Sequence, residues 1–199
     1  MKEALRQQIW NDSNSYTIAK GYEHMRDKSP KIKWHKYVWN QYTVPKHAFL
    51  GWIYYHGNMN TKDKVFNLNI CEHNTCDMCG IATESIDYLF FDCQVSQRIL
   101  QQVSDWVGVR LPVNNIGVWR SQLKEGTTKS DMLNALLNAC IYHIWDQRNK
   151  VRHDLVIYAP QLTAKTVIAD VKIMVRASMD KTKIRGVDGW VTRILNRNL

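Results

Sequence analysis

Apolar and polar positions along the chain alternate in a way that predicts a mainly helical protein. The strongest signal covers residues 130–152, where apolar side chains return every three or four positions: Leu133, Leu136, Leu137, Cys140, Ile141, Ile144 and Trp145. That interval places side chains on one face of an α-helix. A second amphipathic helix is expected after Pro160, with Val167, Ile168, Val171 and Val175 on its apolar face.

Shorter helices are expected upstream. Pro45 suits the first helical position, where its missing N–H costs nothing. The helix that follows carries an apolar stripe and is expected to end at Gly57: Phe49, Trp52 and Ile53. A short helix with Thr61 as its N-cap should turn Val65 and Leu68 inward. One or two helices should lie within residues 84–109, bounded by Gly108 and Pro112.

The N-terminal pattern differs, because residues 15–25 indicate a short strand running into a helix. Five tryptophans are interpreted as core packing residues: Trp39, Trp52, Trp106, Trp119 and Trp145. The resulting fold class is mainly α, a compact helical domain with a small Cys-rich turn resembling a zinc knuckle and a C-terminal helical extension. The expected divisions are a segment 1–14, a domain 15–109 and a basic helical region 110–199.

Composition narrows the class of protein. Apolar residues make up 45% of the 199 positions, which indicates a folded chain. No apolar run reaches eighteen residues, and the first ten residues lack the apolar core of a secretory signal. Five cysteines without such a signal favour a reducing compartment, where close cysteines bind metal more often than they form disulfides. A nuclear or cytoplasmic location is therefore expected.

The cysteines suggest a zinc site. Cys76 and Cys79 have the two-residue spacing that lets one ion accept two sulfurs from a tight turn, and Cys93 is a third candidate. Cys71 is the preferred fourth ligand and His73 the alternative, ahead of the carboxylates Asp87 and Asp92 and of Tyr88. The alternative without metal packs Cys71 and Cys93 as small apolar side chains and Tyr88 in the core.

Charge points to a polyanionic partner. The net charge is +9, of which residues 1–109 carry +1 and residues 110–199 carry +8. Cationic side chains near phosphates release condensed counterions, so such a half suits nucleic acid. Two tracts are candidate nucleic-acid-binding sites: Lys28, Lys31, Lys33, Trp34 and Lys36, and then Lys172, Arg176, Lys181, Lys183 and Arg185. The first interleaves aromatic and cationic side chains, which can stack on bases and hold phosphates.

Catalytic patterns are missing from the sequence. It contains no Asp-Asp pair, and the seven histidines do not suggest a metal triad. His35, His47 and His56 are interpreted as surface or packing residues. We therefore expect a protein that is not an enzyme.

Four ordered segments carry a family resemblance: "SYTIAKGY", "KYVWNQYTVPKHAFLGWI", "NTKDKVFN" and "CDMCGIATESIDYLFFDC". Together they resemble the zinc-binding domain of plant LINE-type (non-LTR retrotransposon) reverse transcriptases. Its Cys signature is matched in register by Cys76, Cys79, Glu84, Asp87, Leu89, Phe90 and Cys93, while Tyr88 stands where the family has a histidine. Downstream, Trp145, Arg148 and Asn149 resemble an Ile-Trp-x-x-Arg-Asn helix that often follows this domain.

The resemblance implies zinc binding and a non-catalytic module that binds nucleic acid, with RNA or single strands favoured over duplex DNA. The alternative is a domesticated protein–protein interaction domain whose metal site has decayed. Tyr88 separates the two hypotheses, because it removes one expected zinc ligand.

Overall fold

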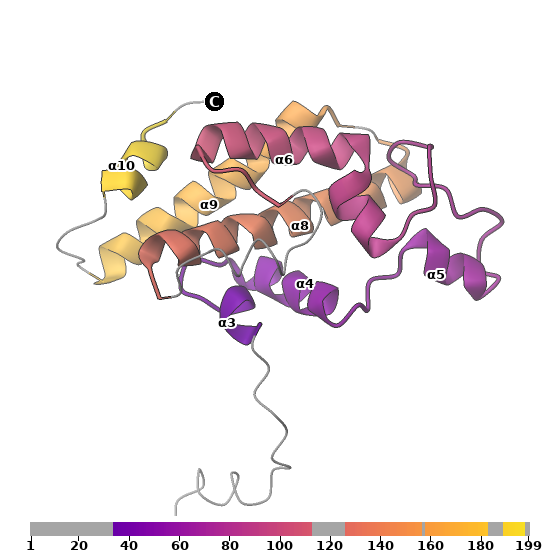
Figure 1. The fold of residues 1–199 in the computed structure, drawn as a ribbon, viewed down its shortest axis with the longest axis horizontal. Coiled ribbons are helices and arrows are strands. Elements are labelled where there is room, and N and C mark those ends of the chain that lie inside the picture. The colour runs from indigo at the N-terminus through magenta and orange to yellow at the C-terminus, as the bar shows by residue number, and fades with distance from the viewer. Residues whose placement is uncertain (1–33, 113–125, 157, 183–188, 198–199) are drawn as a thin grey trace, which may run out of the picture. The chain divides into compact units, whose positions relative to one another are not determined.

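The computed structural model describes residues 34–112, 126–156, 158–182 and 189–197, and in this part of the chain it is mainly helical, as predicted (Figure 1). The elements in chain order are α3 (His35–Val38), α4 (Pro45–Tyr55), α5 (Lys62–Asn67), the π-helical turn η1 (Tyr88–Asp92), α6 (Gln94–Val107), α8 (Thr128–Asp154), α9 (Pro160–Thr182) and α10 (Gly189–Leu195). The described residues contain no strand beyond one antiparallel bridge, Thr75–Thr83. The strand predicted within residues 15–25 lies outside them.

Local signals set several helix ends. Pro45 is the first residue of α4, and Gly108 ends α6 in the left-handed conformation (φ 68°), as the sequence predicts. The Thr127 hydroxyl accepts a hydrogen bond from the Ser130 N–H (3.2 Å) and caps α8. Thr61 does stand at the N-cap of α5, but its hydroxyl donates to Asp63 Oδ1 (2.5 Å) instead of capping a backbone N–H.

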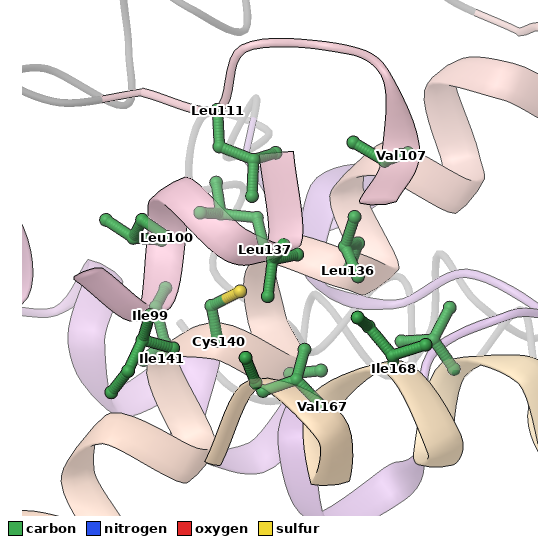
Figure 2. Packing of buried hydrophobic residues seen from close by; sticks show 14 of the residues in the cluster. Ile99, Leu100, Val107, Leu111, Leu136, Leu137, Cys140, Ile141, Val167 and Ile168 are labelled. Carbon is green, nitrogen blue, oxygen red and sulfur yellow. The ribbon is translucent and has the colours of Figure 1, made fainter. Parts of the chain in front are cut away.

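The long helix α8 is the centre of the packing. It contacts α3 and α4 on one side and α9 and α6 on the other, and α6 also packs along α9 (Figure 1). Figure 2 shows the core where α6, α8 and α9 meet, with Ile99 and Leu100, Leu137 and Ile141, and Val167 and Ile168 pointing together. Both periodic helices of the C-terminal half therefore bury their predicted faces against each other and against α6.

The apolar face of α4 is the main correction. Phe49 is 56% exposed and Trp52 is 39% exposed, and the helix packs on α8 through His47, Ala48 and Gly51 instead. Close approach is the reason: a Cβ on Gly51 would lie 2.8 Å from Asn138 Oδ1. Small side chains let two helix backbones come near, and large aromatic ones on that face would hold them apart.

Of the other side chains predicted to be buried, some are buried and some are exposed. Trp106 is buried at 3% exposure, as predicted, and Trp145 is half-buried against the core. Trp39 (53% exposed) and Leu68 (68% exposed) were wrongly predicted to face inward. Trp119 lies outside the described residues.

Candidate functional site

The cysteine cluster is built by a tight loop and the start of a helix. The loop returns on itself through the Thr75–Thr83 bridge, and the Cys76 N–H donates to Ala82 O (2.8 Å). Gly80 closes the turn, since its N–H donates to Cys76 O (2.8 Å) and its φ of 67° favours glycine. Cys93 arrives from η1 and stands at the N-cap of α6.

The sulfurs of Cys76, Cys79 and Cys93 converge as predicted. They lie within 4.8 Å of one another, and Cys76 Sγ is 3.9 Å from Cys93 Sγ. A tetrahedral zinc with Zn–S bonds of about 2.3 Å sets its sulfurs about 3.8 Å apart. The three cysteines therefore fit a zinc ion, which would supply a cross-link between the loop and the N-terminus of α6.

Tyr88 lies beside the three sulfurs. Its hydroxyl oxygen is 3.1 Å from Cys79 Sγ, so the phenol reaches the cluster. Neither predicted fourth ligand joins the three sulfurs: the Cys71 thiol donates to His73 O (3.3 Å) at the outer part of the loop, and His73 is exposed. Cys71 is turned onto the backbone of its own turn, ahead of the bridge that shapes the loop, and so stands apart from the three sulfurs.

The surroundings of Cys93 lower the pKa of its thiol and so favour the thiolate form. The pKa of Cys93 is lowered to about 6, chiefly by the hydrogen bond from Cys76; burial opposes this shift, and the Ser96 and Val95 N–H groups at the start of α6 add to it. The same hydrogen bond and burial raise the pKa of Cys76. The hydrogen bond to Cys79 raises the pKa of Tyr88, so at neutral pH its side chain is a phenol, a poor zinc ligand compared with imidazole.

A buried ion pair fixes the loop to the helices. Arg148 of α8 is 2% exposed, and its Nε donates to Oε1 of the fully buried Glu84 (3.0 Å). The same carboxylate accepts the backbone N–H of Lys62 (3.1 Å) and of Asp77 (3.3 Å), and Lys62 Nζ pairs with Asp77 Oδ1 (2.5 Å). Sequence reasoning singled out Glu84 and Arg148 in two separate motifs but missed that they are partners.

Aromatic rings form a row over α4 and the residue that precedes α3, in which three rings are exposed and those of Trp34 and Tyr55 are partly buried. We call this set the aromatic row: Phe49, Trp52, His56, Trp34 and Tyr55. Successive ring centroids are 6.0 Å apart for Phe49–Trp52, 4.6 Å for Trp52–His56, 5.0 Å for His56–Trp34 and 5.3 Å for Trp34–Tyr55. Trp34 was a predicted nucleic-acid contact, and the exposed Lys36 follows it on α3.

The remaining basic candidates fall into two groups. Lys28, Lys31, Lys33, Lys183 and Arg185, together with the side chain of Lys181, lie outside the described residues. Lys172 Nζ donates to Arg197 O (2.7 Å), and Arg176 donates to Leu195 O (3.2 Å). Cations at carbonyls of a helix C-terminus stabilise that end, so these two side chains hold α10 on α9.

The sequence suggests no histidine metal triad and makes His47 a surface or packing residue, but the structure brings two histidines together beside one carboxylate. His47 is 1% exposed and His143 is 7% exposed, and both lie beside Asp170. Their ligand atoms lie within 4.8 Å of one another. No signal along the chain connects them, since each comes from a different helix.

No helix within the described residues has the length and apolar character to cross a membrane.

Comparison with known proteins agrees with the cysteine geometry. No curated protein and no solved structure matches the chain. Residues 16–99, which include all three clustered cysteines and Tyr88, match the family model described as zinc-binding in reverse transcriptase.

Proposed function

We propose that this chain is a zinc-binding, non-catalytic module that binds single-stranded nucleic acid, RNA in particular, and that it descends from a plant LINE-type reverse transcriptase. The family match and the three-sulfur cluster support the zinc-binding part. The aromatic row carries the nucleic-acid part, because large rings left at the surface offer apolar faces to a partner.

The row has the properties of a stacking surface. Phe49 and Trp52 expose about half and about two fifths of their area, and their ring planes differ by 22°. Aromatic side chains stack on unpaired bases with little regard to sequence. A duplex hides the faces of its bases, so this surface suits single strands.

Cations flank the row. Lys46, whose side chain is 53% exposed, precedes Phe49 by three positions on α4, which places the two on neighbouring parts of the helix surface. Lys36 follows Trp34 on α3. Phosphates of a strand stacked on the row would meet the charges of Lys36 and Lys46. In the sequence, Lys28, Lys31 and Lys33 come before Trp34.

Fluorescence anisotropy with labelled single-stranded RNA tests the proposal on the full chain. Phe49→Ala and Trp52→Ala should each weaken binding by about 1–3 kcal/mol, the usual contribution of one stacked ring. Phe66→Ala is the matched control, since Phe66 is 39% exposed like Trp52 but lies on α5 and not in the row. Binding should also fall steeply as salt rises.

Two results would contradict the proposal. One is the absence of binding by the unmodified chain at low salt. The other is equal binding by Trp52→Ala and the unmodified chain. The first would favour a domesticated protein–protein interaction domain, in which the exposed rings contact a protein partner. The second would show that nucleic acid does not bind through the aromatic row.

A further inference from the structure

A second set of metal-ligating atoms lies where α4, α8 and α9 meet, apart from the cysteine cluster. His143 Nε2 is 3.0 Å from Asp170 Oδ2, and His47 Nε2 is 3.3 Å from the same oxygen. We propose that His47, His143 and Asp170 form a binding site for a divalent transition-metal ion such as Zn²⁺. The inference stands on this geometry and does not depend on the proposed nucleic-acid binding.

The distances suit coordination. Nitrogen and oxygen ligands bind zinc at about 2.0–2.1 Å, so neighbouring ligand atoms of a tetrahedral ion lie about 3.3 Å apart. Both measured separations are close to this value, and all three ligand atoms lie within 4.8 Å of one another. Two imidazoles and one carboxylate are a donor set typical of zinc and of non-haem iron.

Only one of the two histidines in the cluster is hydrogen-bonded to Asp170. His143 is hydrogen-bonded to Asp170, but Nε2 of His47 has no hydrogen-bond partner among the described residues although the side chain is 1% exposed. An unsatisfied buried nitrogen destabilises a fold by about 1–3 kcal/mol. A metal ion would satisfy it.

Access and charge complete the site. A pocket of about 340 Å³ is lined by His143 together with Lys46, Tyr142 and Asp146, so an ion or water can reach His143 from solvent. Lys46 Nζ lies 3.7 Å from Asp170 Oδ2 and opposes a cation there. Because the Lys46 side chain is 53% exposed, its ammonium group can turn to solvent when an ion takes its place.

Metal counting tests the proposal. The full chain is stripped, reloaded with Zn²⁺, freed of excess metal and analysed by mass spectrometry of its metal content. Asp170→Asn, which keeps the size of the side chain, should hold one equivalent less than the unmodified chain, whether or not the cysteine cluster is filled. Asp146→Asn is the matched control, because Asp146 is a nearby carboxylate paired with Lys150, and it should lose nothing.

Cobalt substitution distinguishes the two sites. Thiolate-to-cobalt charge-transfer bands report the cysteines and should be unchanged in Asp170→Asn, while visible bands without thiolate character should disappear. Equal metal content in Asp170→Asn and the unmodified chain would overturn the proposal, as would an equal loss in Asp146→Asn.

A second variant guards against misfolding. In a Cys76→Ser background, added Zn²⁺ should still raise Tm, and the further change His47→Gln should abolish that rise while the helical circular dichroism persists. No rise in the Cys76→Ser background would overturn the proposal. Either result leaves the RNA-binding test of the aromatic row unaffected.

Discussion

The cysteine cluster and the His47–His143–Asp170 cluster place similar numbers of metal-ligating atoms together by different means. Cys76, Cys79 and Cys93 lie within eighteen residues, and one bridge and one glycine turn shape most of the loop. The histidines and Asp170 come from α4, α8 and α9 and meet only because those helices pack. The first cluster can be found in a sequence motif, while the second depends on the core.

The two clusters also differ in how they tolerate change. Loss of a cysteine should affect the loop and the start of α6, whereas a change in helix packing should dismantle the histidine cluster. Arg148 and His143 both stand on α8, so this helix connects the two regions. Variants that act on one cluster and spare the other test the contrast.

The largest effect is expected from Cys93→Ser. It should remove one equivalent of bound zinc. Bound zinc stabilises the folded state, so at free zinc about a thousandfold above its dissociation constant the loss should lower the free energy of unfolding by about 4 kcal/mol. A buried serine at a position with 0% exposure should add to that loss. Metal analysis and urea denaturation measure the two consequences.

Cys71→Ser is the control for the cysteine variant. Because the Cys71 thiol bonds to His73 O and lies outside the cluster, the variant should keep its zinc and its stability. Loss of zinc in Cys71→Ser would instead make Cys71 the fourth ligand and contradict the arrangement described above.

Arg148→Ala should destabilise the protein by about 3–5 kcal/mol, because it leaves the Glu84 carboxylate buried and unpaired. Lys150→Ala breaks the pair with Asp146 on the same helix, but both side chains are about 40% exposed, so the loss should stay below about 1 kcal/mol. Similar losses of unfolding free energy in the two variants would show that the buried pair does not fix the loop.

Acid should destabilise the folded protein by protonating His47 in the histidine cluster. The native pKa of His47 is about 4, below its usual value near 6.5, so the unfolded chain binds more protons between these values. The contribution of His47 to the free energy of unfolding is therefore fully present above about pH 6.5. It is lost as pH drops toward 4, by up to about 3 kcal/mol. The groups facing His47 are Lys46 and Tyr142, as well as His143 and Asp170.

Urea denaturation across this pH range, in the presence of a chelator, measures the effect. His47→Gln should flatten the pH dependence, while His56→Gln, at an exposed position, should retain it. An unchanged pH profile in His47→Gln would assign the acid sensitivity to other groups.

Tyr88 variants should have the smallest effect on stability. Tyr88→Phe removes the hydrogen bond to Cys79 and should cost about 0.5–1.5 kcal/mol. Tyr88→His places an imidazole at the cluster and should tighten zinc binding, which competition with a chromophoric chelator measures. Weaker zinc binding by Tyr88→His than by the unmodified chain would indicate that the phenol itself serves the metal.

Prediction from the sequence succeeded where the cause is local. The periodicity of α8 and α9, the proline start of α4 and the Gly108 end of α6 depend on a few neighbouring residues. The three sulfurs of the cysteine cluster belong to the same class. The choice of Cys71 or His73 as fourth ligand stays a prediction, because it depends on the path of the loop and not on spacing; neither residue belongs to the set of clustered ligand atoms.

The face of α4 shows the limit most clearly. Its aromatic residues and its small residues both recur at helical spacing, so periodicity offered two candidate faces and the larger side chains suggested the wrong one. Only the close approach of α8 at Gly51 decides between them. That choice leaves Phe49 and Trp52 exposed to solvent.

By itself, the sequence determined the helical class, the long apolar faces and the trio of cysteines, because backbone preference, side-chain period and short loops act over a few residues. Tertiary structure alone decided the pairing of Glu84 with Arg148, the exposure of the aromatic row and the meeting of His47, His143 and Asp170. These depend on which helices pack and how closely, and that is set by the shapes of side chains far apart in the chain.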